Sequence, residues 1–110
     1  MELPDIITDL PEIEFPFPSD TVKTSALKSD KGLLVFFQCL KDVKVPAHSH
    51  KAQRGTVLDG QIELTISGET KIYRPGESYN IPSGAVHSAK LPAGSKIIDF
   101  FEEPERYKLK

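Results

Sequence analysis

The chain has 110 residues, and its 14 Lys and Arg side chains against 16 Asp and Glu give a formal charge of −2. With 38% apolar and 27% charged residues, it has the composition of one ordinary soluble domain. No apolar run approaches the roughly 20 residues of a membrane span, and the near-neutral charge argues against nucleic acid as a partner. Cys39 is the single cysteine, which excludes an internal disulfide. No signal peptide is visible, so we expect a reduced, cytoplasmic protein with no membrane partner.

The N-terminal segment differs in composition from the rest of the chain. Residues 1–20 carry six acidic side chains, four prolines and no Lys or Arg. The prolines disfavour a long helix, whereas Ile13, Phe15 and Phe17 alternate with acidic residues or proline, as in a strand. We predict an extended arm over residues 1–20, followed by a β domain over residues 21–110. The arm either lies on its own domain or is exchanged with a partner subunit, where it would cover a sheet edge.

From residue 33 onward, short β-branched and aromatic runs are separated by Gly, Pro, Ser and Asp. The predicted strands cover residues 33–40, 43–45, 56–58, 61–66, 70–73, 78–81, 86–91 and 96–101. Such closely spaced turn signals with little helical periodicity predict an all-β sandwich or barrel. The one helix that the sequence predicts is a short piece near Glu102 to Tyr107.

The three histidines of the chain, His48, His50 and His87, suggest a metal site. On a strand, His48 and His50 would project from one face about 7 Å apart. Both rings could then reach one ion, because a zinc-type ion lies about 2.0–2.1 Å from each ligand nitrogen. Gln53 follows closely and could add its amide oxygen. The spacing alone leaves open that His48 and His50 are exposed residues of a polar loop.

The residues around these histidines resemble the two sequence motifs of the cupin family. Pro46 to Gln53, followed by Gly60, resembles the first motif, and Pro75 to His87 resembles the second. The resemblance covers about residues 33–101. It implies an all-β, RmlC-like double-stranded β-helix (jelly-roll barrel), often as a homodimer. It also implies one divalent metal ion (Zn, Ni, Mn or Fe) held by four side chains: His48, His50, Gln53 and His87.

The chain departs from the cupin pattern at the fourth metal ligand. Gln53 stands where the family usually has glutamate, and two residues separate it from His50 where the family mostly has three or four. A neutral amide leaves the cation with its full charge, which strengthens its Lewis acidity and its attraction for anionic ligands. The shortened loop also leaves open that Gln53 is drawn off the metal, giving a three-histidine site.

Asp99 is an acidic residue in the otherwise apolar run 97–101, where period two places it on the same face as Phe101. Because an unpaired buried charge is costly, Asp99 needs an ion-pair partner or a place in the barrel pocket as a general acid or base. The ending Asp99-x-Phe101, followed by Arg106, partly resembles the pectin-degradation cupins that linearise unsaturated uronates. In that group the corresponding aspartate, phenylalanine and arginine serve catalysis and substrate binding.

Three further side chains are candidates for substrate binding beside Phe101 and Arg106. Arg74 would hold a carboxylate or lie solvated on the surface. Gln38 would be a pocket donor if its face of the strand is interior, because an unsatisfied buried amide is costly. Tyr79 would line the pocket or simply pack.

We therefore predict a small homodimeric cupin that binds one divalent metal ion and acts on a small polar, acidic or sugar-derived molecule. The metal would polarise a carbonyl or enol oxygen of the substrate while Asp99 moves a proton. Two alternatives stay open, because one barrel hosts many functions. The first alternative is a sensor barrel that binds a ligand without turnover, and the second is a metal-dependent dioxygenase.

Overall fold

The computed structural model describes all 110 residues and contains nine strands and one four-residue helix. The single helix has four residues, far fewer than a membrane-spanning helix needs. The predicted all-β class is confirmed. The elements in chain order are α1 (Asp5–Thr8), β1 (Val22–Lys28), β2 (Leu33–Cys39), β3 (Val43–His48), β4 (Gln53–Asp59), β5 (Ile62–Ile66), β6 (Glu69–Tyr73), β7 (Ser78–Ile81), β8 (His87–Leu91) and β9 (Lys96–Phe101).

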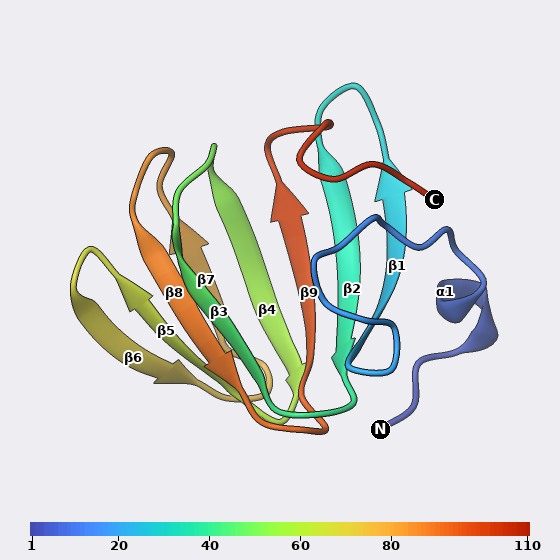
Figure 1. The fold of residues 1–110 in the computed structure, drawn as a ribbon, viewed down its shortest axis with the longest axis horizontal. Helices are drawn as coiled ribbons and strands as arrows, with labels where there is room; N and C mark the ends of the chain where they lie inside the picture. Colours follow the sequence, from blue (N-terminus) through green and yellow to red (C-terminus); the bar gives the residue numbers. More distant parts are fainter.

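The strands form two antiparallel sheets that face each other (Figure 1). One sheet has the order β1-β2-β9-β4-β7 and the other the order β3-β8-β5-β6. In Figure 1, β8 passes in front of β7, so the two sheets overlap in this view. Side chains on the inner faces of the strands point between the sheets, as the strand period of two requires. Together with Ile13 of the N-terminal segment, they form a core of 17 buried apolar residues.

Two segments differ from the sequence prediction. The sequence does not predict β1, because its residues VKTSALK are short on the β-branched and aromatic types that mark strands. It forms because it pairs along its whole length with β2. The prediction of a short helix near Glu102 to Tyr107 is wrong, because no helix forms there. Pro104 disfavours helix at the residue before it, and the chain makes turns in which the Arg106 N–H donates to the Glu103 carbonyl.

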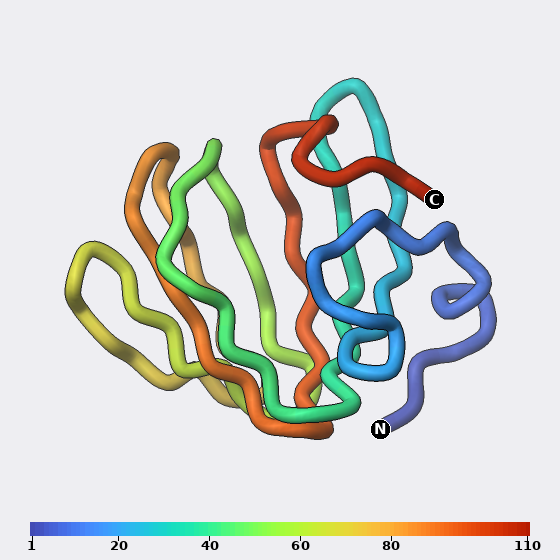
Figure 2. Tube along the Cα trace, viewed as in Figure 1, coloured from blue at the N-terminus to red at the C-terminus, as the bar shows by residue number.

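The N-terminal segment lies on its own barrel in this chain. Residues 5–8 form one helical turn, which the prediction of an extended arm missed. Beyond it the chain is extended, and the Ile13 N–H donates to Oγ1 of Thr24 at 3.0 Å. A bridge between Ile13 and Leu109 ties this segment to the C-terminal end of the chain. Figure 2 shows the two segments, blue and red, running close together across the same side of the molecule.

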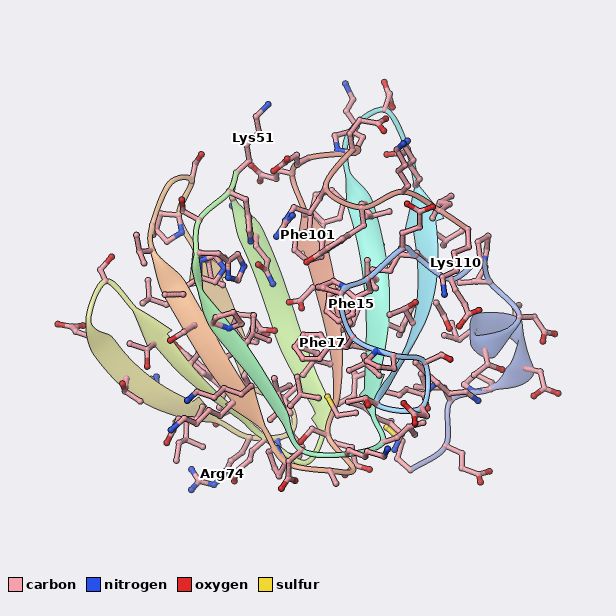
Figure 3. All side chains as sticks on the ribbon, viewed as in Figure 1. Phe15, Phe17, Lys51, Arg74, Phe101 and Lys110 are labelled. Carbon is pink, nitrogen blue, oxygen red and sulfur yellow. The ribbon has the colours of Figure 1, made fainter.

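Phe15 anchors this segment to the barrel. Its ring centroid lies 5.2–5.4 Å from the rings of Phe17, Phe37 and Tyr107, and Figure 3 shows Phe15 and Phe17 together in the middle of the molecule. We expect Phe15→Ala to lower the free energy of unfolding by about 2 kcal/mol, less than a fully buried phenylalanine would cost. Chemical denaturation measures this. Phe17→Ala, which removes one of these ring contacts, should cost less, and an equal or larger loss would contradict the anchoring role.

Cys39 is a buried residue at the end of β2. Burial raises the pKa of its thiol to about 11, so on the order of 1% is thiolate at pH 9. We expect no labelling of the native protein by iodoacetamide up to pH 9, and one label per chain after unfolding in guanidinium. Mass spectrometry gives the count. Labelling of the native protein at the rate of a free thiol would show that the barrel opens to solvent.

Candidate metal centre

Three histidines from two distant segments meet between the sheets. His48, the last residue of β3, is paired across the ladder with His87, the first residue of β8. The strand ends at His48, so His50 comes from the following loop and not from the same strand. The candidate ligand atoms of the three rings all lie within 4.8 Å of one another. Two nitrogens on one zinc-type ion are at most about 4 Å apart, so small ring rotations would bring all three onto a common ion.

The hydrogen bonds of the three rings leave Nε2 free for a metal. Each Nδ1 lies 2.7–2.9 Å from a backbone carbonyl oxygen, and the three carbonyls belong to Pro46, Lys51 and Ala85. Because a carbonyl oxygen only accepts, each Nδ1 carries the hydrogen and each Nε2 keeps its lone pair. The Nε2 atoms of His50 and His87 are buried without a hydrogen-bond partner. A cation between these lone pairs would satisfy them, so the residues fit a metal ion.

The electrostatic surroundings favour the neutral imidazoles that bind metals. Burial lowers the pKa of His50 and of His87, and the positive charge of Arg106 lowers both further. The hydrogen bonds to the backbone carbonyls act in the opposite direction and are the smaller effect. A lowered pKa extends the neutral, metal-binding form to lower pH.

A cavity of about 80 Å³ lies beside these rings, with room for a few water molecules or one small ligand. His48, His87 and Gln53 line it together, and most of its other walls are apolar. Gln53 is the first residue of β4 and is buried on the inner face. The structure therefore brings the predicted fourth ligand to the same cavity.

Asp99 lines the same cavity and is 2% exposed. Its partner is the hydroxyl of Tyr79, which donates to Oδ1 at 2.7 Å; the structure shows no ion pair to Lys or Arg. Burial raises the pKa of Asp99 from 3.8 to about 6, although hydrogen bonds from Tyr79 and Gln53 act to lower it. The pKa of Tyr79 is raised by burial and by Asp99, so this hydroxyl remains a donor. A carboxyl with such a pKa can exchange a proton near neutral pH.

Gly55 makes the contact between Tyr79 and Asp99 possible. On the five-stranded sheet Gly55 is the direct neighbour of Tyr79 on β7 and of Asp99 on β9. A Cβ at this position would overlap Oδ1 of Asp99 and the phenol ring of Tyr79. Sequence reasoning missed this residue. A glycine inside a strand is the signal that could have found it, because it often marks a close approach of neighbouring groups.

Phe101 and Arg106, the residues predicted to bind substrate, lie at the histidine end of the barrel. The Phe101 ring is buried, and its centroid is 5.6 Å from that of His50. The guanidinium of Arg106 lies over the ring of Tyr107 at 4.5 Å, and its buried Nε has no hydrogen-bond partner. Arg106 therefore holds a spare donor and a positive charge near the histidines, which suits an anionic group.

The structure does not bring Arg74 or Gln38 to the cavity, so the substrate-binding positions predicted for them are wrong, and the solvated alternative for Arg74 is the one observed. Arg74 is an exposed residue in the turn after β6, and Figure 3 shows it at the opposite end of the molecule from Lys51, the neighbour of His50. Gln38 lies on the outer face of β2 beside a surface groove. The inner face of that strand belongs instead to the buried set Leu33, Val35, Phe37 and Cys39.

The family assignment rests on a match over most of the barrel. A family model described as "Cupin domain" matches residues 40–97, more than half of the chain. The protein belongs to the cupin family. An RmlC-like cupin from Shewanella frigidimarina is similar to it with a TM-score of 0.74 and 26% identity, over 89% of this cupin and 87% of that chain. KdgF from Halomonas sp. has a TM-score of 0.72 at 22% identity, over 86% and 87%. The jelly-roll fold of a small cupin is thus confirmed.

Curated relatives match this cupin over a small part of their own length. Mannose-1-phosphate guanylyltransferase ManC from Salmonella typhimurium is 37% identical over 81 residues, which are 74% of this chain and 15% of that protein. Quercetin 2,3-dioxygenase from Bacillus subtilis is 44% identical over 48 residues, 42% of this chain and 14% of that protein. The shared part is a cupin segment within much longer proteins.

Proposed function

We propose that this cupin is a metal-dependent enzyme acting on a small polar substrate that carries a carboxylate or derives from a sugar. One observation supports this most: a set of unpaired lone pairs, a buried acid and an unpaired cationic donor share one end of the barrel. The acid is Asp99, with a pKa of about 6, and the donor is Arg106. One divalent ion (Zn, Ni, Mn or Fe) would be held by His48, His50 and His87, with Gln53 as the fourth ligand.

The chemistry follows from the positions of the side chains. A bound divalent cation would supply Lewis acidity toward a carbonyl or enol oxygen of the substrate. Asp99 would take a proton from the substrate and return it at another atom, as isomerase and lyase reactions require. Arg106 would hold the carboxylate, and the Phe101 ring would keep water from one side of the reacting atoms. The apolar walls strengthen each of these electrostatic interactions.

The resemblance of Asp99-x-Phe101 and Arg106 to the ending of the pectin-degradation cupins makes unsaturated uronates the first substrates to test. Protein purified without added metal would be analysed for its metal content. It would then be screened against unsaturated uronates and keto sugars with that metal in excess. We expect turnover of at least one, and a loss of about 10²–10⁴-fold in Asp99→Asn with the metal site still saturated. Normal turnover by Asp99→Asn would remove Asp99 from the mechanism, and tight binding without turnover would favour a sensor barrel.

A second candidate function is that of a metal-dependent dioxygenase, which the 44% identity to a segment of quercetin 2,3-dioxygenase favours. This function needs oxygen as a co-substrate, whereas the isomerase or lyase reaction does not. An oxygen electrode with iron-loaded protein and a panel of thiols and catechols separates the two. Oxygen uptake that depends on both metal and substrate would support the dioxygenase, and its absence would leave the first proposal.

A further inference from the structure

Gln53 and Asp99 are diagonal neighbours on the inner face of the five-stranded sheet. β4 and β9 pair so that Gln53 lies opposite Phe101 and Gly55 lies opposite Asp99. Diagonal pairs on one face of an antiparallel ladder are within reach of long side chains. Both side chains line the cavity beside the histidines, and the Gln53 amide is close enough to the Asp99 carboxyl to act on its pKa.

The chemistry of this contact decides which way the Gln53 amide faces. A carboxylate only accepts hydrogen bonds, so both of its partners must donate. The Tyr79 hydroxyl donates to Oδ1 of Asp99, and a Gln53 amide that turns toward this carboxylate must likewise present its NH₂ group. Its Oε1 is then left for the cavity that it shares with His48 and His87.

We propose that Tyr79 and Asp99 form an orienting chain that turns the oxygen of Gln53 toward the three histidines and thereby makes Gln53 a metal ligand. The inference rests on the metal binding of the proposed function. It gives Asp99 a positioning role in addition to proton transfer. Gly55 supports the chain, because no larger residue leaves room for the contact between Tyr79 and Asp99.

Orientation matters because an amide has two unlike ends. The last side-chain torsion of glutamine is broad, so a free Gln53 would present its NH₂ as readily as its oxygen. An NH₂ group facing a cation is repelled. Partners that orient a metal ligand are typically worth about 10- to 100-fold in metal affinity.

The test is a double-mutant cycle on the affinity of the metal-free protein for Zn²⁺, measured by competition with a chromophoric chelator. We expect Asp99→Leu to weaken binding about 10- to 100-fold. Gln53→Ala should weaken it by at least as much, because both variants lose the oriented oxygen. The double variant should bind no more weakly than the weaker single variant. If Asp99 acted only through its negative charge, the two losses would multiply, and that result would overturn the inference. Unchanged affinity in Asp99→Leu would also overturn it.

Tyr79→Phe repeats the cycle with a gentler change, which keeps the ring and removes the donor to Asp99. It should weaken Zn²⁺ binding a few-fold in the wild-type background and have no effect in Gln53→Ala. An equal effect in both backgrounds would contradict the orienting chain. Circular dichroism checks the fold of each variant. If Asp99→Leu does not fold, the cycle of Tyr79→Phe and Gln53→Ala tests the inference by itself.

The absorption spectrum of bound Co²⁺ reports directly whether Gln53 coordinates the metal, independently of how tightly the metal binds. Co²⁺-loaded Gln53→Ala should show an altered visible absorption spectrum, and Asp99→Leu should show the same alteration. A wild-type spectrum in Asp99→Leu would overturn the inference. If the wild-type protein bound neither Zn²⁺ nor Co²⁺, the proposed function itself would fail. If it bound both and the cycle were additive, only the orienting role would fail.

Discussion

His87→Ala is expected to abolish tight metal binding by this cupin. His87 supplies one of the three candidate ligand nitrogens that lie close together, and it begins the strand that pairs with His48. Because changes to residues that only support a ligand already cost 10–100-fold, loss of a ligand should weaken Zn²⁺ binding by more than about a hundredfold. Elemental analysis should fall from one ion per wild-type chain to near zero, and isothermal titration calorimetry gives the affinity.

The variant should still fold, which keeps this result interpretable. The buried Nε2 of His87 has no hydrogen-bond partner within the protein, and such a group is destabilising when no ion is bound to it. Its removal offsets part of the packing lost with the ring. Zn²⁺ should therefore raise the melting temperature of the wild type but not of His87→Ala. Ser49→Ala, an exposed change between the other two histidines, is the matched control and should behave as wild type. Full metal content in His87→Ala would place the metal elsewhere.

The sequence predicted the residues of the metal centre better than it predicted the strands on which they lie. The motifs around His48, His50 and His87 depend on local spacing, which is visible in one dimension, and the structure brings these side chains together. The inner position of Asp99 also follows from the period of two along β9. Which face of β2 is interior does not follow from its own sequence, because that run is apolar on both faces. The misplacement of Gln38 has this cause.

Contacts between distant strands account for what the sequence did not show. β1 is a strand because it pairs with β2, not because of its own composition. The partner of Asp99 could be named only once β7, β4 and β9 were placed in order, since Tyr79 reaches Asp99 across Gly55. The sheet arrangement also keeps residues apart. It places Arg74 in a turn at the far end of the barrel from the histidines, which the sequence around Arg74 does not show.

Gly55→Ala is expected to lower the free energy of unfolding by about 4 kcal/mol or more. Overpacking a core costs about 1–3 kcal/mol by itself. Here the added methyl group would overlap both Asp99 and Tyr79, so it would also break their hydrogen bond and leave buried polar groups unsatisfied, at about 1–3 kcal/mol more. The backbone of Gly55 is not in the left-handed region, so alanine carries no conformational strain of its own there. Denaturation in urea measures the loss.

Gly76→Ala is the control that distinguishes steric overlap at Gly55 from the general cost of replacing a glycine. At Gly76 a Cβ would meet nothing within 4 Å, but the φ of +86° strains any other residue. Gly76→Ala should therefore cost only about 1 kcal/mol. The excess loss at Gly55 then measures how tightly Asp99 and Tyr79 close over it. If Gly55→Ala cost no more than Gly76→Ala, the two side chains would be free to move apart, and the close packing that holds the buried acid in place would not exist.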